Sequence, residues 1–126
     1  MKRLALTIAA VLAVAFAVDA ATAASVPTGK YRTTIASGFL AGKWTMDFYR
    51  RGRYKVTGPF GSVTGRTSFN GARVTFSHES QGTMCPGAGT YSWKLVGRKL
   101  TLKTIKESCR VRRLVHARTW TKPLTG

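Results

Sequence analysis

The residues between Cys85 and Cys109 constrain the fold more than any other part of the chain. Apolar and polar side chains alternate along GTYSWKLV (89–96) and again along RKLTLKTI (98–105), and Gly97 lies between the two runs. Alternation with a period of two is typical of a strand with one buried face. Glycine at the first turn position suits a tight hairpin. We therefore predict a β-hairpin formed by residues 89–96 and 99–105.

The register of this hairpin follows from its turn. Pairing across Gly97-Arg98 matches apolar partners on one face: Leu95 with Leu100, Trp93 with Leu102, and Tyr91 with Thr104. The same register leaves Cys85 and Cys109 one residue out of step, and the Pro and Gly residues of 86–89 provide the slack for a bulge. These are the only two cysteines of the chain, so we predict a disulfide across the open end of the hairpin.

Alternation recurs along the rest of the chain after residue 25, punctuated by glycine, and no long apolar stripe has a helical period. We predict eight strands, at residues 30–37, 42–50, 53–57, 62–69, 72–77, 89–96, 99–105 and 111–122. Short connections favour an antiparallel up-and-down order. Eight such strands can close into a barrel, which removes exposed edges. A two-sheet β-sandwich is the alternative.

The parity of each strand predicts which side chains enter the barrel. The inward set contains the larger aromatic residues, which would contact a bound molecule: Tyr31, Trp44, Phe48, Tyr54, Phe76, Tyr91, Trp93 and Trp120. Lysine and arginine fall on the opposite parity and form a distributed outer coat. We expect no aromatic residues on that basic face, which argues against a dedicated groove for single-stranded nucleic acid.

The last predicted strand, residues 111–122, departs from this pattern. His116 and Arg118 share the parity of Leu114 and Trp120, so all four are predicted to point inward. A buried guanidinium needs a partner because an unpaired buried charge is costly. One interpretation is that Arg118, together with His116, contacts an anionic head group of a bound ligand. The alternative is that Arg118 caps the barrel end, stacked on an aromatic ring and hydrogen-bonded to carbonyls.

The N-terminus has the form of a secretory signal peptide. Lys2 and Arg3 precede a small and apolar run over residues 4–18, and Ala21-Thr22-Ala23 resembles a signal-peptidase site. We expect cleavage after Ala23, which leaves residues 24–126 as a single barrel domain. The expected location is secreted or periplasmic, where a disulfide is stable.

The net charge of +17 is extreme for 126 residues. Without residues 1–23 the chain keeps 19 basic residues and three acidic ones, namely Asp47, Glu79 and Glu107. Such a field attracts polyanions in a salt-dependent way. An anionic envelope polymer is therefore a candidate partner, whereas no specific nucleic acid is predicted.

Several short motifs resemble the calycin superfamily, which includes lipocalins, fatty-acid-binding proteins and avidins. Gly29-Lys30-Tyr31 and Gly42-Lys43-Trp44 are each similar to the lipocalin Gly-x-Trp. Arg118 resembles the lipocalin arginine that packs across that aromatic residue, and Arg118-x-Trp120 is similar to a carboxylate-holding Arg-x-Tyr of fatty-acid-binding proteins. The resemblance implies a barrel that binds a small apolar or amphipathic ligand.

In plan alone, the chain also resembles small periplasmic inhibitors of metalloproteases, which insert a free N-terminus into the protease. No catalytic function is expected, because the mature chain has no pair of carboxylates suited to acid–base chemistry. His78 and His116 are the only histidines and have no metal-ligand spacing, so neither a metal nor a cofactor is predicted. We interpret the chain as a non-enzymatic ligand-binding barrel. The alternative is an interaction protein that acts through its loops, N-terminus or basic surface.

Overall fold

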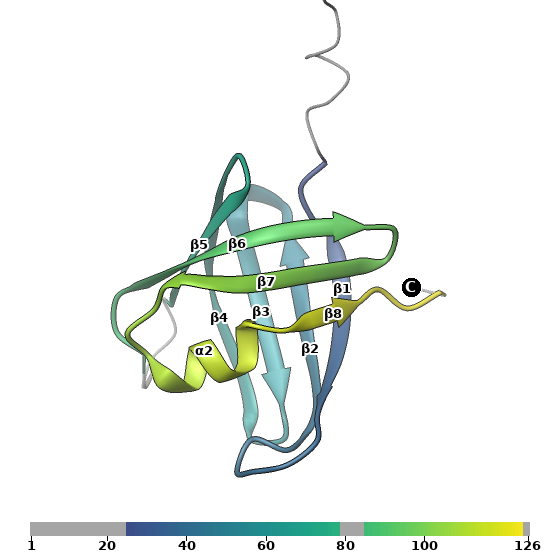
Figure 1. Ribbon diagram of the computed structural model, residues 1–126, viewed down its shortest axis with the longest axis vertical. Helices are drawn as coiled ribbons and strands as arrows, with labels where there is room; N and C mark the ends of the chain where they lie inside the picture. The colour runs from purple at the N-terminus through teal and green to yellow at the C-terminus, as the bar shows by residue number, and fades with distance from the viewer. Residues whose placement is uncertain (1–24, 79–84, 125–126) are drawn as a thin grey trace, which may run out of the picture.

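The computed structural model describes residues 25–78 and 85–124, and the predicted signal peptide lies outside them. These residues form one closed barrel of eight antiparallel strands in sequential order (Figure 1). The strands are β1 (Gly29–Ile35), β2 (Gly42–Tyr49), β3 (Arg53–Gly58), β4 (Gly61–Asn70), β5 (Arg73–His78), β6 (Ala88–Val96), β7 (Lys99–Lys106) and β8 (Thr119–Thr121). The predicted barrel is confirmed, and closure excludes the sandwich because β8 pairs with β1 through Thr121 and Arg32.

The hairpin of β6 and β7 has the predicted register. Its turn is Gly97-Arg98, and Gly97 has a φ of 59°. All three predicted pairs are present: Leu95 with Leu100, Trp93 with Leu102, and Tyr91 with Thr104. The register then shifts between Thr90, which pairs with Lys106, and Tyr91, so this irregularity lies outside the residues 86–89 where a bulge was predicted. Cys85 and Cys109 form the predicted disulfide, with their Cα atoms 5.3 Å apart. Local alternation and one turn were therefore sufficient to place this part of the chain.

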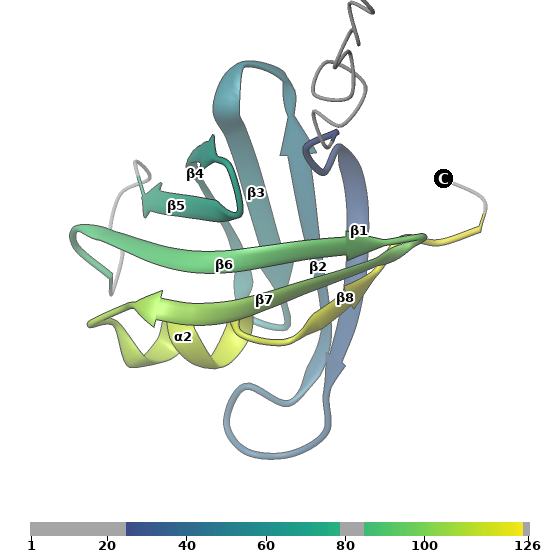
Figure 2. The ribbon, with the colours of Figure 1, turned by 45° about the horizontal axis from the view of Figure 1, so that its top comes forward.

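The prediction for residues 111–122 is wrong in part. The chain forms a short helix, α2 (Arg110–His116), and only Thr119–Thr121 joins the barrel, as β8. Arg112, Val115 and His116 are buried, and their spacing of three and four residues is that of one helix face rather than one strand face. Figure 2 shows α2 beside the end of β7, at the opposite end of the barrel from the start of β1.

The inward faces of β1 to β7 agree with the predicted parity. Met46, Tyr54, Phe76, Tyr91 and Leu100 have exposed fractions of 0–1%, and Trp120 of β8 is likewise fully buried. Phe69, Trp93 and Leu95 are only partly buried and pack at the edge of this core. The core is therefore dense in the middle and at the α2 end, and looser at the end where residues 25–28 enter β1.

Candidate functional site

The middle of the barrel is occupied by the protein's own aromatic rings. Phe76 lies at their centre, with its ring centroid 5.0 Å from that of Tyr54, 5.6 Å from that of Tyr91 and 4.7 Å from that of His116. All three contacts are edge-to-face arrangements, which aromatic rings favour. These four predicted ligand contacts therefore act as core residues, and each of them is at most 1% exposed.

The remaining interior residues of the predicted set are also engaged. Phe48 packs edge-on against Tyr31 at 5.9 Å. The indole N–H of Trp44 donates to the Leu40 carbonyl at 2.8 Å, and that of Trp120 donates to the His116 carbonyl at 3.2 Å. Buried indole nitrogens need such acceptors, so both tryptophans are held in place by backbone.

A buried ion pair closes the α2 end of the barrel. Both Arg112 and Glu107 have side chains with 0% exposure, and their contact is bidentate: Nε of Arg112 donates to one carboxylate oxygen and Nη2 donates to the other at 2.8 Å. The Tyr91 hydroxyl also donates to Glu107, at 2.6 Å. Arg112 Nη1 reaches the Gly87 carbonyl at 3.2 Å, so the pair connects β6, β7 and α2 with the segment before β6.

The electrostatics of this pair follow from its geometry. Burial alone would raise the pKa of Glu107, but hydrogen bonds from Arg112 and Tyr91, and the guanidinium charge, hold that pKa below its usual value. Burial raises the pKa of Tyr91, and the bond to Glu107 raises it further. Glu107 is therefore a carboxylate and Tyr91 a neutral donor at neutral pH, and neither group is poised to exchange a proton there.

His116 lies inside the barrel as predicted, although it arrives from a helix. Its ring stacks on Tyr91 with a centroid distance of 5.8 Å and an interplanar angle of 26°. Nδ1 lies 3.0 Å from the Arg112 carbonyl, one helical turn earlier. His116 is thus part of the aromatic cluster formed by Tyr54, Phe76 and Tyr91.

Arg118 does not enter the barrel, and the prediction that it points inward is wrong. Because residues 110–116 are helical, the strand parity on which it depended does not hold. Its Nε and Nη2 both donate to the Leu114 carbonyl, at 3.2 and 3.0 Å, in an exposed setting. Of the predicted alternative, in which Arg118 stacks on an aromatic ring and bonds to carbonyls, the hydrogen bonds show only a bond to one carbonyl, four residues earlier in α2.

The cation that packs across the aromatic ring of the Gly29-Lys30-Tyr31 motif is Lys122. Its Nζ lies 5.7 Å from the centroid of the Tyr31 ring and donates to the Thr28 carbonyl at 3.1 Å. The resemblance to lipocalins implied that Arg118 would pack across this aromatic ring. In the structure Lys122, which directly follows β8, lies there instead.

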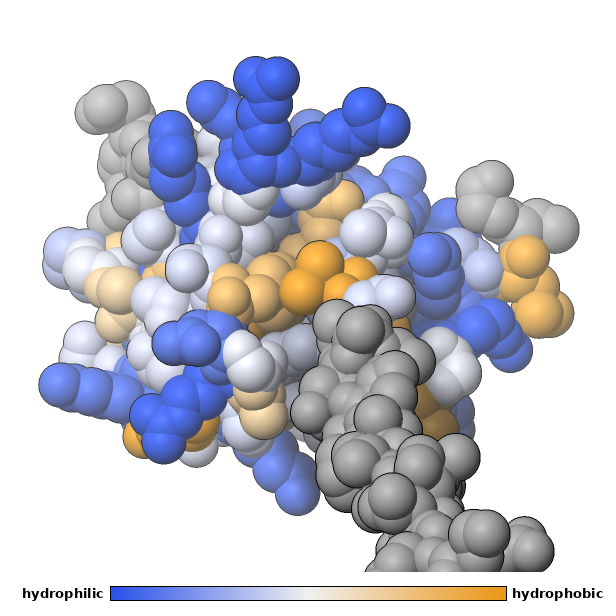
Figure 3. All heavy atoms as spheres, turned by 90° about the horizontal axis from the view of Figure 1, so that it is seen from above, coloured by the Kyte–Doolittle hydropathy of each residue, from blue (hydrophilic) through white to orange (hydrophobic). Residues whose placement is uncertain are grey.

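An open depression lies at the end of the barrel opposite α2. Its volume is about 560 Å³, and it is lined by Ser25, Gly71, Ala72, Trp93, Lys94, Leu95 and Gly97. Figure 3 looks onto this end and shows apolar surface surrounded by polar and basic side chains. A volume of this size is within the range of small-molecule sites.

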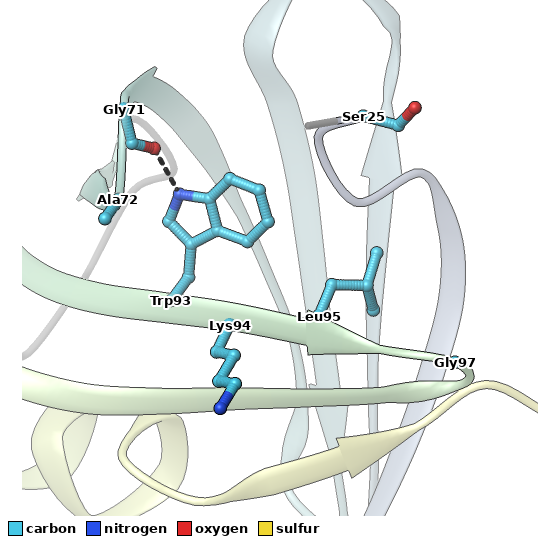
Figure 4. A pocket seen from close by; sticks show the side chains of 7 residues that line it. All are labelled: Ser25, Gly71, Ala72, Trp93, Lys94, Leu95 and Gly97. Atoms are coloured by element: carbon cyan, nitrogen blue, oxygen red, sulfur yellow. Dashed lines mark hydrogen bonds between the residues drawn. The ribbon is translucent and has the colours of Figure 1, made fainter. Parts of the chain in front are cut away.

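Trp93 is the principal side chain of this depression. Its indole N–H donates to the Gly71 carbonyl at 2.8 Å, and its ring meets Phe69 edge-on at 5.6 Å. Figure 4 shows that Trp93 and Leu95 extend from the same side of β6, whereas Lys94 extends from the other side. The site therefore presents one fixed aromatic ring and one aliphatic side chain, with small residues opposite.

Within residues 25–78 and 85–124, no group of three histidine, cysteine, aspartate or glutamate side chains could hold a metal ion. None of the helices in the described part of the chain is long and apolar enough to span a membrane. Comparison with known proteins found no matching family model, no matching curated protein and no matching solved structure.

Two important residues were missed by sequence reasoning. Glu107 is one of only three acids outside the predicted signal peptide, yet it was given no role. Arg112 was assigned to a strand, although Arg112 and His116 have the four-residue spacing of neighbours on one helix face. That spacing, together with the absence of clean alternation over residues 111–122, was the signal for a helix.

Proposed function

We propose that this protein is an exported, non-enzymatic, lipocalin-like barrel of the calycin type. In this proposal it binds a small, flat, apolar or amphipathic molecule in the open depression beside Trp93. The observation that carries the proposal is an aromatic ring held in place at the barrel mouth, next to an unfilled volume. Because the middle of the barrel is packed, the site differs from the interior one expected from the sequence.

The chemistry of the lining supports an apolar ligand. Trp93 offers a ring that a flat molecule can contact, and its hydrogen bond to Gly71 together with the Phe69 contact restricts its motion. A side chain that is already ordered loses little entropy on binding. Leu95 adds aliphatic surface, while the lysine next to it extends away, so a formal charge on the ligand is not required.

Native mass spectrometry of the exported protein, recovered without organic solvent, is the direct test. We expect a bound small molecule that is lost from Trp93→Ala. The fluorescent dye 1-anilinonaphthalene-8-sulfonate serves as a defined probe in parallel. Removing the indole should weaken dye binding at least about tenfold, since apolar contacts of this size are worth more than 1.4 kcal/mol.

The matched control is Val96→Ala, which shortens an apolar residue on the same strand that is 61% exposed and does not line the depression. This variant should bind the dye as the parent protein does. Equal losses in both variants, or no effect of Trp93→Ala in a folded protein, would refute binding at the depression.

A further inference from the structure

A cluster of arginines surrounds the turn between β2 and β3. The turn is a short 3₁₀ segment, η1 (Arg50–Gly52), and Arg53 begins the next strand. Arg50, Arg51 and Arg53 are all exposed, so three guanidinium groups occupy four consecutive positions. Figure 1 places this turn at the end of the barrel opposite α2.

The strand register extends this cluster sideways and adds an aromatic ring. Tyr49 of β2 lies opposite Arg53 of β3, and Arg53 lies opposite Arg66 of β4. Side chains at paired positions project from the same face, with their Cβ atoms about 5 Å apart. Tyr49 is 53% exposed, so the expectation that the basic face carries no aromatic residue is wrong.

The described acid closest to this cluster in the register is Asp47. It lies opposite Lys30 on β1 and opposite Lys55 on β3, so lysines flank it on both sides. Burial, the charge of Asp47 and a hydrogen bond to Asp47 all raise the pKa of Tyr49, burial most, and so favour a neutral phenol beside the carboxylate. The cluster therefore keeps a net positive charge next to an uncharged ring.

The backbone of the turn holds Arg51 in a conformation that is unfavourable for arginine. Arg51 has φ 62° and ψ 34°, and it is the only non-glycine residue with positive φ among those described. Asparagine, aspartate and glycine adopt this region more readily than arginine. Backbone strain of this kind concentrates at functional sites.

The turn is also held in a defined position. A side chain at Gly52 would collide with the Thr67 carbonyl of β4, so the turn passes directly against that strand. Close packing of this kind restricts the arginine-bearing backbone before any partner arrives. A backbone that is already held in place loses little further entropy when the arginines on it bind an anion.

We propose that Arg50, Arg51 and Arg53, flanked by Tyr49, form a binding site for consecutive phosphate groups of a linear polyanion. Guanidinium groups bind phosphate oxygens through paired, charge-assisted hydrogen bonds, and three of them at neighbouring positions can contact several phosphates of one chain. This site is separate from the depression beside Trp93. It shares no residue with that depression, and its proposed function does not require a ligand there.

The test compares two variants with the same net charge. One variant carries Arg50→Gln, Arg51→Gln and Arg53→Gln. The control carries Arg32→Gln, Arg73→Gln and Arg113→Gln, which remove three exposed arginines from β1, β5 and α2. Binding to inorganic polyphosphate of defined length is measured at several salt concentrations.

We expect the clustered variant to bind polyphosphate at least about tenfold more weakly than the parent, and to lose about two to three units of salt slope. The control should lose no more than about threefold. Equal losses in the two variants would mean that only the general field of the protein acts, and would overturn the proposal. Equally tight binding of poly-L-glutamate by the parent protein would overturn the assignment to phosphate.

A second variant, Arg51→Asn, separates binding from stability. Asparagine relieves the strain, so the thermal midpoint should rise by a few degrees while polyphosphate affinity falls at least about threefold. A merely structural arginine would change the midpoint without changing the affinity. An unchanged affinity of this variant would therefore contradict the proposed site.

Discussion

The two ends of the barrel differ in how the apolar core is covered. At the α2 end, the helix brings Arg112 and His116 onto the core, and Glu107 meets both Arg112 and Tyr91. At the other end no helix covers the core among the described residues, and Trp93 and Leu95 remain partly exposed beside an open depression. One end is closed by charge and hydrogen bonds, and the other is left apolar and accessible.

The difference between the two ends shows which part of a small barrel is left unfilled by its own side chains. Eight short strands enclose little more volume than their own aromatic side chains fill, so the middle is a core. The closed end adds buried polar groups. Each of them needs a hydrogen-bond partner, because a buried polar group without one is costly. The open depression beside Trp93 lies outside these polar contacts, and the arginine turn of η1 lies at the same end.

The strongest way to break this comparison is to remove one member of the buried pair. Arg112→Met leaves the Glu107 carboxyl without its cation and should lower the free energy of unfolding by about 3–5 kcal/mol. Urea denaturation measures the change. The double variant Glu107→Leu with Arg112→Met should recover much of the loss, because neither charge is then buried. A double variant as unstable as the single one would show that the two side chains are not energetically coupled.

The disulfide supports the same end, and its removal should have the next largest effect. Replacing Cys85 and Cys109 by serine should cost about 3 kcal/mol in the chain-entropy model, since the bond closes a loop with a sequence separation of 24. The thermal midpoint before and after reduction of the parent protein gives an independent measurement. An unchanged midpoint would contradict a stabilising role for the bond.

Acid should weaken the closed end selectively. The pKa of Glu107 is lowered in the folded protein, so its contribution to stability is complete above the unfolded-state pKa of about 4.3. It decreases as pH falls through that value toward the folded pKa, because the unfolded chain binds the proton first. Denaturation from pH 7 to 3 should show a decline that is flatter in Glu107→Gln. Parallel curves for the two proteins would assign the decline to other groups.

The open end should tolerate change best. We expect Trp93→Ala to cost only about 1–2 kcal/mol, less than the roughly 3–5 kcal/mol of a buried tryptophan, because its ring is already partly exposed. Trp120→Ala, which removes a fully buried ring, provides the contrast. Acrylamide should quench the Trp93 emission more than that of Trp44 or Trp120. Equal costs for the two alanine variants would erase the distinction between the two ends.

Much of the fold was predictable because its signals are local. Alternation along β1 to β7 identified strands and faces, and the Gly97-Arg98 turn set the register of β6 and β7. For the hairpin of β4 and β5, the predicted strands at residues 62–69 and 72–77 leave Asn70 and Gly71 as the turn. The observed turn is Gly71-Ala72, one residue later, because Asn70 pairs with Arg73. Such a one-residue shift is possible because glycine can occupy either the first or the second position of a two-residue hairpin turn.

The candidate sites were less predictable. The sequence drew attention to Trp93 as one of several inward rings, but it did not show that this ring lies at the mouth. Nor did alternation distinguish the helix of residues 110–116 from a strand. An isolated helix of seven residues is not stable in water, so tertiary contacts of Arg112, Val115 and His116 determine its formation.

The sequence by itself determined antiparallel strands with one apolar face, one basic face and a single disulfide, because period-two alternation and turn chemistry act between near neighbours. It left a barrel and a sandwich open, and the pairing of β8 with β1 decided for the barrel. The tertiary structure alone decided that Glu107 meets Arg112, that Lys122 rather than Arg118 covers Tyr31, and that one end stays open. These outcomes depend on which strand and helix ends meet once the barrel closes, and that closure joins residues far apart along the chain.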